Sequence, residues 1–426
     1  MSAPNTQDPT APQDAMFSLL SGASADMLAN PFPLFALMRS LGAVTPIPFP
    51  LAGPDHQAWM ITRMEEAVRA LKDHARFTVD ASAAGIDSFF GQTTASSSDV
   101  SDTPTFFTSK TMLTVDEPDH RRLRGLVSKV FTPRYIESLR PRVQEIADEL
   151  LDHAQAQGQM ELIADYAFPL PINVISEMLG VPRADRERIR VWSGALATGQ
   201  SLGGRNPEVI EHMRAFGEYT LQLVAEKREH PGEDLISQLI SIEEEGDRLS
   251  ERELLAMITL LIFAGHETTS NLIGTGSFML LDHPEQMEKL KADLSLVPTA
   301  VEELLRFSGP ATIAGPRFAT EDVELGGQQI KRGDVVLIAL ASANHDETQF
   351  SDPDELDIAR SISRHLAFGH GIHVCLGAPL ARLEGDIAFT TLLKRMPNLR
   401  LNCPRESVTW QMSLLSRSLS ALPVAF

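Results

Sequence analysis

The chain has 426 residues, of which 43% are apolar and 22% are charged, and this composition excludes a disordered or fibrous protein. The formal net charge of −20 argues against binding to nucleic acid or to an anionic membrane surface. No apolar run is long enough to span a membrane, the N-terminus lacks the pattern of a signal peptide, and two cysteines do not make a disulfide framework. We therefore expect a soluble, cytoplasmic protein.

The first third of the chain combines a polar tail, short elements and a long segment without periodicity. Residues 1–15 are expected to form a disordered tail, and residues 16–426 a single domain. The expected elements are helices at 31–41 and 63–73 and a strand at 59–62. Residues 79–114 show no pattern, and an aperiodic segment of this length is typical of a functional loop or lid.

Helical periodicity dominates the middle of the chain. Pro118 stands at a helix start, where proline is favoured. The segment 254–281 is long and mostly apolar, so we expect a helix that crosses the core. Further helices are expected at 136–156, 173–179, 183–197 and 208–227, with a glycine-containing link at 199–207.

Beyond Arg306 the pattern changes to short strands separated by glycine-containing turns. Strands expected at 323–325, 329–330 and 335–338 predict a small meander. An irregular stretch covers 344–373, a final helix covers 376–393, and short strands close the chain. The expected fold class is therefore mainly α with a minor β portion.

The strongest chemical signal is the glycine-rich segment from Phe368 to Gly377. Its glycines allow tight turns and a close approach of the backbone to a flat ligand. Cys375 falls where this loop becomes a helix, and helix N-terminal amides favour the thiolate, which is the form that binds metal. Taken alone, the residue fits a buried structural cysteine equally well.

A second unusual run, Ala264 to Thr269, interrupts the long apolar helix. Glu267 is a carboxylate inside an apolar element, and Gly265 and the threonines are poor helix formers. A threonine hydroxyl and a freed carbonyl can open the helix and admit water. The run is either a functional site or a helix kink with a partly exposed acid.

Phe368, Gly371, Cys375 and Gly377 have the spacing of the cysteine-loop signature of the cytochrome P450 superfamily, and residues 378–384 continue the similarity. The chain resembles the soluble bacterial members of that superfamily. The resemblance implies a mainly helical fold with heme b (iron protoporphyrin IX) between a long distal helix and the cysteine loop. It implies that Cys375 is the axial ligand of the iron and that His373 donates to a haem propionate.

The resemblance also gives the run in the long helix a role. Glu267 and Thr268 match the acid–alcohol pair that delivers protons during oxygen activation, which is general acid catalysis through water. Gly265 would give room for dioxygen.

Two residues of the next helical segment, Glu303 and Arg306, lie three apart on one helix face and can pair. They match the structural Glu-x-x-Arg pair of the superfamily. Glu355 and His345 stand where related chains frequently have an arginine, so the third partner of this pair stays open.

His120 and Arg124 lie four apart on one face of the helix that begins near Pro118. An exposed basic helix start is the plain interpretation, and the resemblance implies instead that both bind the haem propionates. Arg317 matches a third propionate-binding position. Residues 117–134 carry five cations against Glu117 and Asp119, which makes either a solvated face or a docking patch for an acidic redox partner.

The expected enzyme is a monooxygenase that inserts one atom of O2 into an apolar substrate by hydroxylation or epoxidation. A ferredoxin and its NAD(P)H-dependent ferredoxin reductase would supply the electrons. The substrate would be a steroid, fatty acid, terpenoid or polyketide, because the expected lining is apolar. The residues expected to face the substrate are Phe89, Phe90, Leu261, Ala264, Ile313 and Leu415.

Two alternatives remain at this stage. One is peroxide-driven oxidation or oxidative coupling on the same fold, although an acid–alcohol pair for dioxygen would be superfluous in peroxide chemistry. The other is a non-catalytic haem-binding or metal-binding protein that uses His370, His373 and Cys375.

Overall fold

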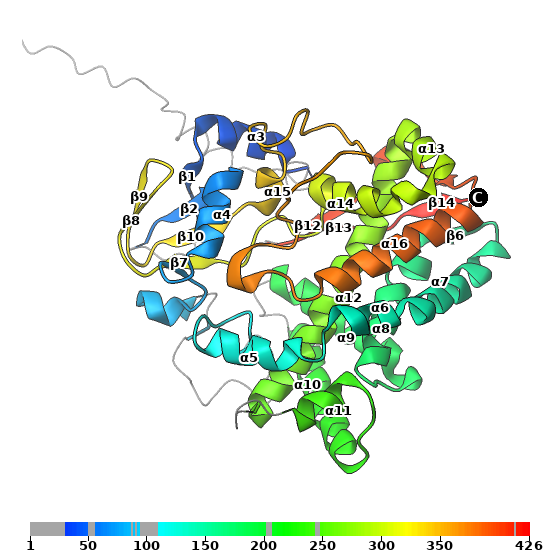
Figure 1. The fold of residues 1–426 in the computed structure, drawn as a ribbon, viewed down its shortest axis with the longest axis horizontal. Helices are drawn as coiled ribbons and strands as arrows, with labels where there is room; N and C mark the ends of the chain where they lie inside the picture. Colours follow the sequence, from blue (N-terminus) through cyan, green and yellow to red (C-terminus); the bar gives the residue numbers. More distant parts are fainter. Residues whose placement is uncertain are drawn as a thin grey trace, which may run out of the picture.

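A computed structural model of the chain describes residues 30–49, 56–86, 88–89, 92–93, 110–201, 207–242, 248–412 and 415–426. The described chain consists of a large helical portion and a smaller portion built on a β-sheet (Figure 1). This confirms the expected mainly helical fold class. The expected tail at 1–15 lies outside the described residues, and no helix among the described residues is long and apolar enough to cross a membrane.

The β portion is organised around a five-stranded sheet with the order β1-β2-β10-β7-β3. Strands β2 and β10 run parallel, and the other neighbours are antiparallel. All residues of β10 are buried: Val335 and Leu337 pack with helix α3, whereas Val336 and Ile338 pack with helix α4. The bounds are α3 Phe32–Leu41, β1 Val44–Ile47, β2 Ala58–Ile61, α4 Met64–Lys72, β3 Phe77–Thr78, β7 Arg317–Ala319 and β10 Val335–Ile338.

The meander expected after Arg306 is wrong in its pairing. Strands β8 (Val323–Leu325) and β9 (Gln328–Ile330) form a hairpin of their own, while β10 pairs with β2 and β7. Parallel pairing of β10 with a strand from the beginning of the chain is a tertiary contact, and local periodicity carries no signal for it.

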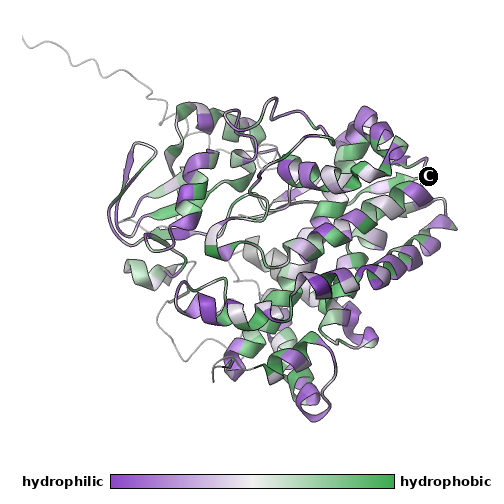
Figure 2. Ribbon diagram, in the orientation of Figure 1, coloured by the Kyte–Doolittle hydropathy of each residue, from purple (hydrophilic) through white to green (hydrophobic). Residues whose placement is uncertain are grey.

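The long helix α12 (Glu251–Asp282) runs through the helical portion, as the apolar run 254–281 predicted. It begins with a capping box, in which Ser250 and Glu253 each bond the other's backbone amide. The helices that pack against it include α8 (Pro169–Met178), α14 (Val297–Ser308) and α16 (Ala378–Arg395). In Figure 2 outer helices such as α7 (Arg140–Gln155) and α13 (Pro284–Ala292) carry many hydrophilic residues, whereas α12 is mostly apolar.

The remaining helices and strands follow the expected order with shifted limits. The helix expected at 136–156 is two helices that meet at Leu139, because Pro141 has no N–H to donate and is favoured in the first turn of a new helix. The aperiodic segment 79–114 contains a short hairpin. The other elements are β4 Ser88–Phe89, β5 Gln92–Thr93, α5 Asp119–Ser128, α6 Pro133–Ser138, β6 Gln159–Glu161, α9 Arg186–Ser201, α10 Pro207–Glu229, α11 Leu235–Ser241, α15 Leu340–Ala343, β11 Arg400–Leu401, β12 Trp410–Met412, β13 Arg417–Leu419 and β14 Pro423–Ala425.

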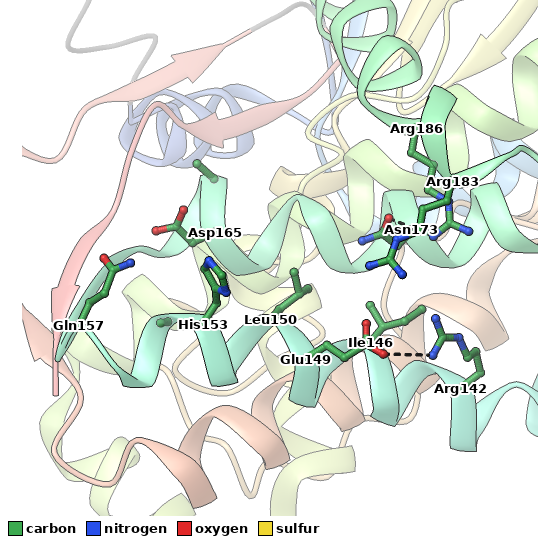
Figure 3. Close-up of a pocket in the computed structure, with 12 residues that line it drawn as sticks. Arg142, Ile146, Glu149, Leu150, His153, Gln157, Asp165, Asn173, Arg183 and Arg186 are labelled. Carbon is green, nitrogen blue, oxygen red and sulfur yellow. Dashed lines mark hydrogen bonds and ion pairs between the residues drawn. The ribbon is translucent and has the colours of Figure 1, made fainter.

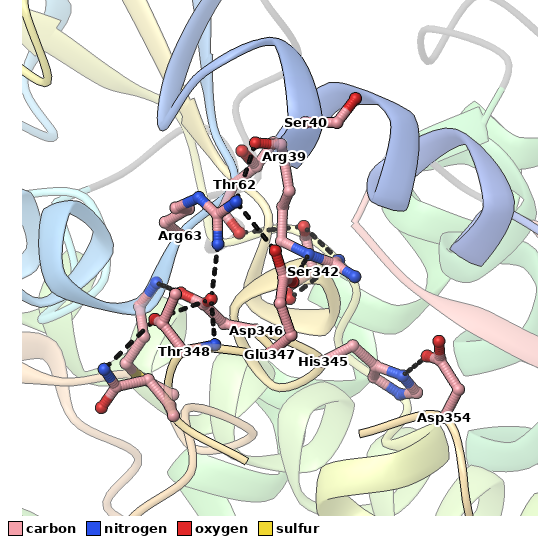
Figure 4. Close-up of polar contacts among 12 residues, drawn as sticks. Arg39, Ser40, Thr62, Arg63, Ser342, His345, Asp346, Glu347, Thr348 and Asp354 are labelled. Carbon is pink, nitrogen blue, oxygen red and sulfur yellow. Dashed lines mark hydrogen bonds and ion pairs between the residues drawn. The ribbon is translucent and has the colours of Figure 1, made fainter. Parts of the chain in front are cut away.

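A polar network joins α3 and α4 to the segment that follows α15 (Figure 4). Arg63 donates to Asp346 and Glu347, both at 2.8 Å, and Arg39 donates to Glu347 at 3.1 Å and to the Ser342 carbonyl at 3.2 Å. Because Asp346 is buried, the network is shielded from water on that side. It fixes both helices of the β portion to the stretch that leads to the cysteine loop.

Candidate active site

The cysteine loop holds Cys375 just before α16. The Cys375 amide donates to the Phe368 carbonyl at 2.9 Å, and Gly369 and Gly371 have φ values of +69° and +74°, in the left-handed region that favours glycine. The thiol lies deep enough for burial to raise its pKa, while the Gly377 and Ala378 amides and the charge of Arg124 act to lower it. The residue is nevertheless exposed, since no described side chain covers it. The loop therefore presents a thiol whose anionic form, the thiolate, is stabilised by backbone amide donors.

Gly371 packs directly on the backbone of α4. A Cβ at this position would lie 2.2 Å from the Leu71 carbonyl oxygen. We expect Gly371→Ala to lower the free energy of unfolding by about 2 kcal/mol or more, because a left-handed alanine alone costs about 1–2 kcal/mol and the backbone overlap adds to it. Denaturant titration measures the loss. Gly327→Ala is the matched control, since Gly327 has a φ of +79° with nothing within 4 Å of its Cβ position. Equal losses in the two variants would contradict the packing argument.

One face of α12 is exposed among the residues that the structure describes. Ala264 and Thr268, one turn apart, are exposed in a helix whose other central residues are mostly buried. The Thr268 hydroxyl donates to the Ala264 carbonyl at 3.0 Å. The threonine side chain thus bonds to the backbone of its own helix, which threonine can do in a helix interior. The segment 264–269 of α12 therefore borders an open space on the side of Ala264 and Thr268.

Glu267 lies beside this face without an ion pair to any described residue. Burial raises its pKa to about 7, so the carboxyl takes up and releases a proton near neutral pH. The Cβ position of Gly265 lies 3.1 Å from Ile175 of α8, which shows that this glycine lets α8 approach α12. Its expected role toward dioxygen stays a prediction.

Buried nitrogen-bearing side chains with few partners gather between α5, the cysteine loop and β7. Both ring nitrogens of His120 are buried without a hydrogen-bond partner, and burial lowers the pKa of His120 to about 4. Arg317 donates to the carbonyls of Gly315 and Pro316, its own neighbours, and burial lowers its pKa to about 10. Arg124 is half-buried on the same helix as His120. Since buried polar groups are nearly always partnered, this cluster fits an anionic ligand.

His373 stands beside the same cluster and already has a carboxylate partner. Its Nε2 is 2.8 Å from Asp116 Oδ1, and its ring centroid is 4.5 Å from that of His120. Asp116 was not among the predicted residues; its other oxygen accepts from the Thr78 hydroxyl at 2.6 Å and from the Val79 amide at 2.9 Å. No group of three His, Cys, Asp or Glu among the described residues could hold a metal ion, which disfavours a metal site of His370, His373 and Cys375.

The Glu303–Arg306 pair forms as expected, and its missing partner is Arg360. Arg306 donates to both carboxylate oxygens at 2.7 and 2.8 Å, and Arg360 Nε donates to Glu303 Oε1 at 3.1 Å. Arg360 follows Glu355 in the irregular stretch and therefore does not stand at the position where related chains frequently have this arginine. His345 instead lies 2.8 Å from Asp354 and from the Phe307 carbonyl. The cluster holds the segment before the cysteine loop in place.

Of the residues expected to face a substrate, Ile313 and Leu415 are brought together. The Leu415 carbonyl accepts from the amide of Thr312 at 2.9 Å and of Ile313 at 3.5 Å. Leu261 is buried in α12, one turn before exposed Ala264. Phe90 and the side chain of Phe89 lie outside the described residues.

The basic start of α5 is partly neutralised by neighbouring acids. Arg122 forms an ion pair with Glu253 of the α12 capping box, and Arg121, whose side chain is 82% exposed, lies 3.0 Å from Glu117. The exposed basic face is therefore smaller than the composition of residues 117–134 suggests.

Comparisons with known proteins agree on one family. The family model described as Cytochrome P450 matches residues 206–418. The chain is 41% identical to the polyketide biosynthesis cytochrome P450 PksS of Bacillus subtilis, over 93% of this chain and 96% of that one. It is also 41% identical to the vitamin D(3) 25-hydroxylase of Pseudonocardia autotrophica, over 93% of each chain. The crystal structure of myxobacterial cytochrome P450 CYP267B1 in complex with myristic acid is similar, with a TM-score of 0.83, 40% identity, and coverage of 94% of this chain and 98% of that one.

Proposed function

The chain belongs to the cytochrome P450 family and is a haem monooxygenase; from this premise we propose that it inserts one atom of O2 into an apolar small molecule by hydroxylation or epoxidation. The observation that carries the proposal is the combination of an uncovered thiol at Cys375 with a titratable acid, Glu267, beside the open face of α12. The thiol suits a metal ligand, and the acid suits proton delivery.

The residues of the cysteine loop and of α5 fit heme b as the cofactor. Cys375 would bind its iron, and His120, Arg124, Arg317 and His373 would hold its two propionates, which need donors where they are buried. When bound, the haem supplies the chemistry of oxygen activation, and the protein supplies the ligand, the protons and the pocket. The buried nitrogens of His120, which have no hydrogen-bond partner and lie no closer than 4.0 Å to Glu117, support this assignment.

Proton transfer falls to two neighbours on α12. Glu267, whose pKa burial raises to about 7, would exchange protons with solvent, and the Thr268 hydroxyl would hold a proton on the exposed face of the helix. This pair favours dioxygen over peroxide as the oxidant. No observation on the described residues favours peroxide-driven oxidation or oxidative coupling.

An apolar substrate of the polyketide, fatty-acid, steroid or terpenoid class is our proposal for the molecule oxidised. The relatives named for polyketide biosynthesis and for vitamin D(3), and the similar structure with myristic acid, support this range. Leu261, Ala264, Ile313 and Leu415 would contribute an apolar lining. A screen of these classes for spin-state changes of the haem would identify the substrate.

Electrons would come from a ferredoxin and an NAD(P)H-dependent ferredoxin reductase in the cytoplasm. The exposed cations of residues 117–134, which include Lys129 and Arg134, would contact the acidic ferredoxin.

The ferrous carbon-monoxide spectrum of the purified holoenzyme tests the proposed ligand. We expect the red-shifted band of a thiolate-ligated haem, and we expect Cys375→Ala to abolish it because no other described thiol lies in the loop. Cys403→Ala is the matched control and should keep the band, since Cys403 lies beyond α16. A band that survives in Cys375→Ala would overturn the ligand assignment.

A further inference from the structure

A groove outside the candidate active site lies along α7 and shares no residue with that site (Figure 3). Its volume is about 410 Å³, which is within the range of small-molecule sites. Residues of α7 form one side, and Asn173 of α8 and Arg183 and Arg186 around the start of α9 close one end. The groove is thus large enough for a ligand of modest size.

The closed end of the groove is rich in arginine donors. Arg142 and Arg186 share the carboxylate of Glu177, at 2.8 Å from Arg142 Nε and 3.1 Å from Arg186 Nη1. Arg186 Nε is buried without a hydrogen-bond partner, and Arg183 has no ion pair or side-chain hydrogen bond with any described residue. Asn173 accepts from Arg186 through its Oδ1 at 3.3 Å, which leaves its NH₂ group as a further donor. Arg142 also donates to Glu145 at 2.8 Å and to Glu149 at 3.5 Å, so the donors that remain for a ligand belong to Arg183, Arg186 and Asn173.

The floor of the groove is apolar. Ile146, Leu150 and Ala154 recur every four residues of α7, so they lie along one face of the helix. Figure 3 shows Leu150 between the arginine end and the end with His153 and Gln157. A ligand with an apolar body would lie along this face.

The side of the groove opposite α7 contains a π-helical turn, which is a rare backbone conformation. Ala164 and Asp165 lie in a π-helical turn, Ile163–Ala167, and such turns are frequent at functional sites. This observation is independent of the arginine cluster, and it points to the same place.

We propose that the groove binds a small organic carboxylate. The carboxylate lies between Arg183, Arg186 and Asn173, and the apolar body lies along Ile146, Leu150 and Ala154. Arginine suits this task because its planar fork matches the two oxygens of a carboxylate. The ligand is an effector rather than the oxidised substrate, since the groove and the candidate active site share no residue.

The test uses the haem-loaded enzyme with 4-phenylimidazole bound in the haem pocket, so that a second ligand cannot enter there. The probe is 4-fluorobenzoate, followed by ¹⁹F NMR. We expect saturable binding that Arg183→Gln weakens at least tenfold and that 4-fluorobenzyl alcohol, which lacks the charge, does not reproduce. Arg190→Gln is the matched control, because Arg190 is an exposed arginine of α9 outside the groove, and it should leave the Kd unchanged.

Three results would overturn the proposal. They are a lack of saturable binding to the wild-type enzyme, an unchanged Kd in Arg183→Gln, and binding that disappears when 4-phenylimidazole fills the haem pocket. Arg183 is exposed, so its replacement is not expected to unfold the chain, and a thermal melt of the variant checks this.

Discussion

Replacing Arg306 with methionine is expected to lower the free energy of unfolding by about 3–5 kcal/mol, the cost of leaving a buried charge without its main partner. Arg306 is only 1% exposed and donates to both oxygens of Glu303 as well as to the carbonyls of Asn344 and Pro353. Without it, the buried carboxylate keeps Arg360 and the Asp357 amide, at 3.1 and 3.0 Å. Urea titration followed by circular dichroism measures the loss.

Arg405→Met is the control for this variant. Arg405 pairs with Asp282, but its side chain is 65% exposed, and such surface pairs contribute about 0–1 kcal/mol. If Arg306→Met destabilised the chain no more than Arg405→Met does, the buried cluster would not be the anchor of the segment before the cysteine loop.

Among changes that leave the proposed iron ligand in place, Glu267→Gln is expected to have the largest effect on turnover. We expect product formation to fall by about 10²-fold, the lower end of the range for a general acid–base group, because glutamine keeps the shape of the side chain but cannot exchange a proton. The carbon-monoxide band and the haem content should be unchanged. The measurement is the rate of product formation per haem, with NAD(P)H consumption recorded alongside.

The pH dependence gives this prediction a second signature. Burial raises the pKa of Glu267 to about 7, so the carboxyl holds its proton below that pH and loses it above. Product formation by the wild-type enzyme should therefore decline as the pH rises through about 7, and this step should be missing in Glu267→Gln. Glu251→Gln is the control, since Glu251 lies exposed in the first turn of the same helix. A Glu267→Gln enzyme with wild-type turnover and the same pH profile would show that protons arrive by another route.

The sequence predicted the elements whose signals are local. The apolar run 254–281 and the cysteine loop followed by a helix appear in the structure within a few residues of their expected limits, because periodicity, caps and glycines act over short distances. The parallel pairing of β10 with β2 could not be predicted in this way. Nor could the division of the helix at Leu139, where the apolar period continues and only Pro141 marks the break.

For the candidate site, spacing carried more information than residue type. Cys375 and the Glu303–Arg306 pair follow fixed intervals in the chain, whereas Arg360 and Asp116 meet their partners through loops of irregular shape. A charged residue in an irregular stretch has no periodicity to mark it.

The pairing of β2 with β10 also bears on the order of folding. A strand made near the start of the chain is completed by one made about three quarters of the way along, and Arg39 and Arg63 reach the same late segment. Contacts that join distant parts of a chain form slowly, because a long loop must close first. Helices between these strands can form while the chain is still being synthesised. Helix α4, on which Gly371 packs, is held in its final position only after β2 and β10 have paired. We therefore expect the cofactor to bind late in the folding of the chain.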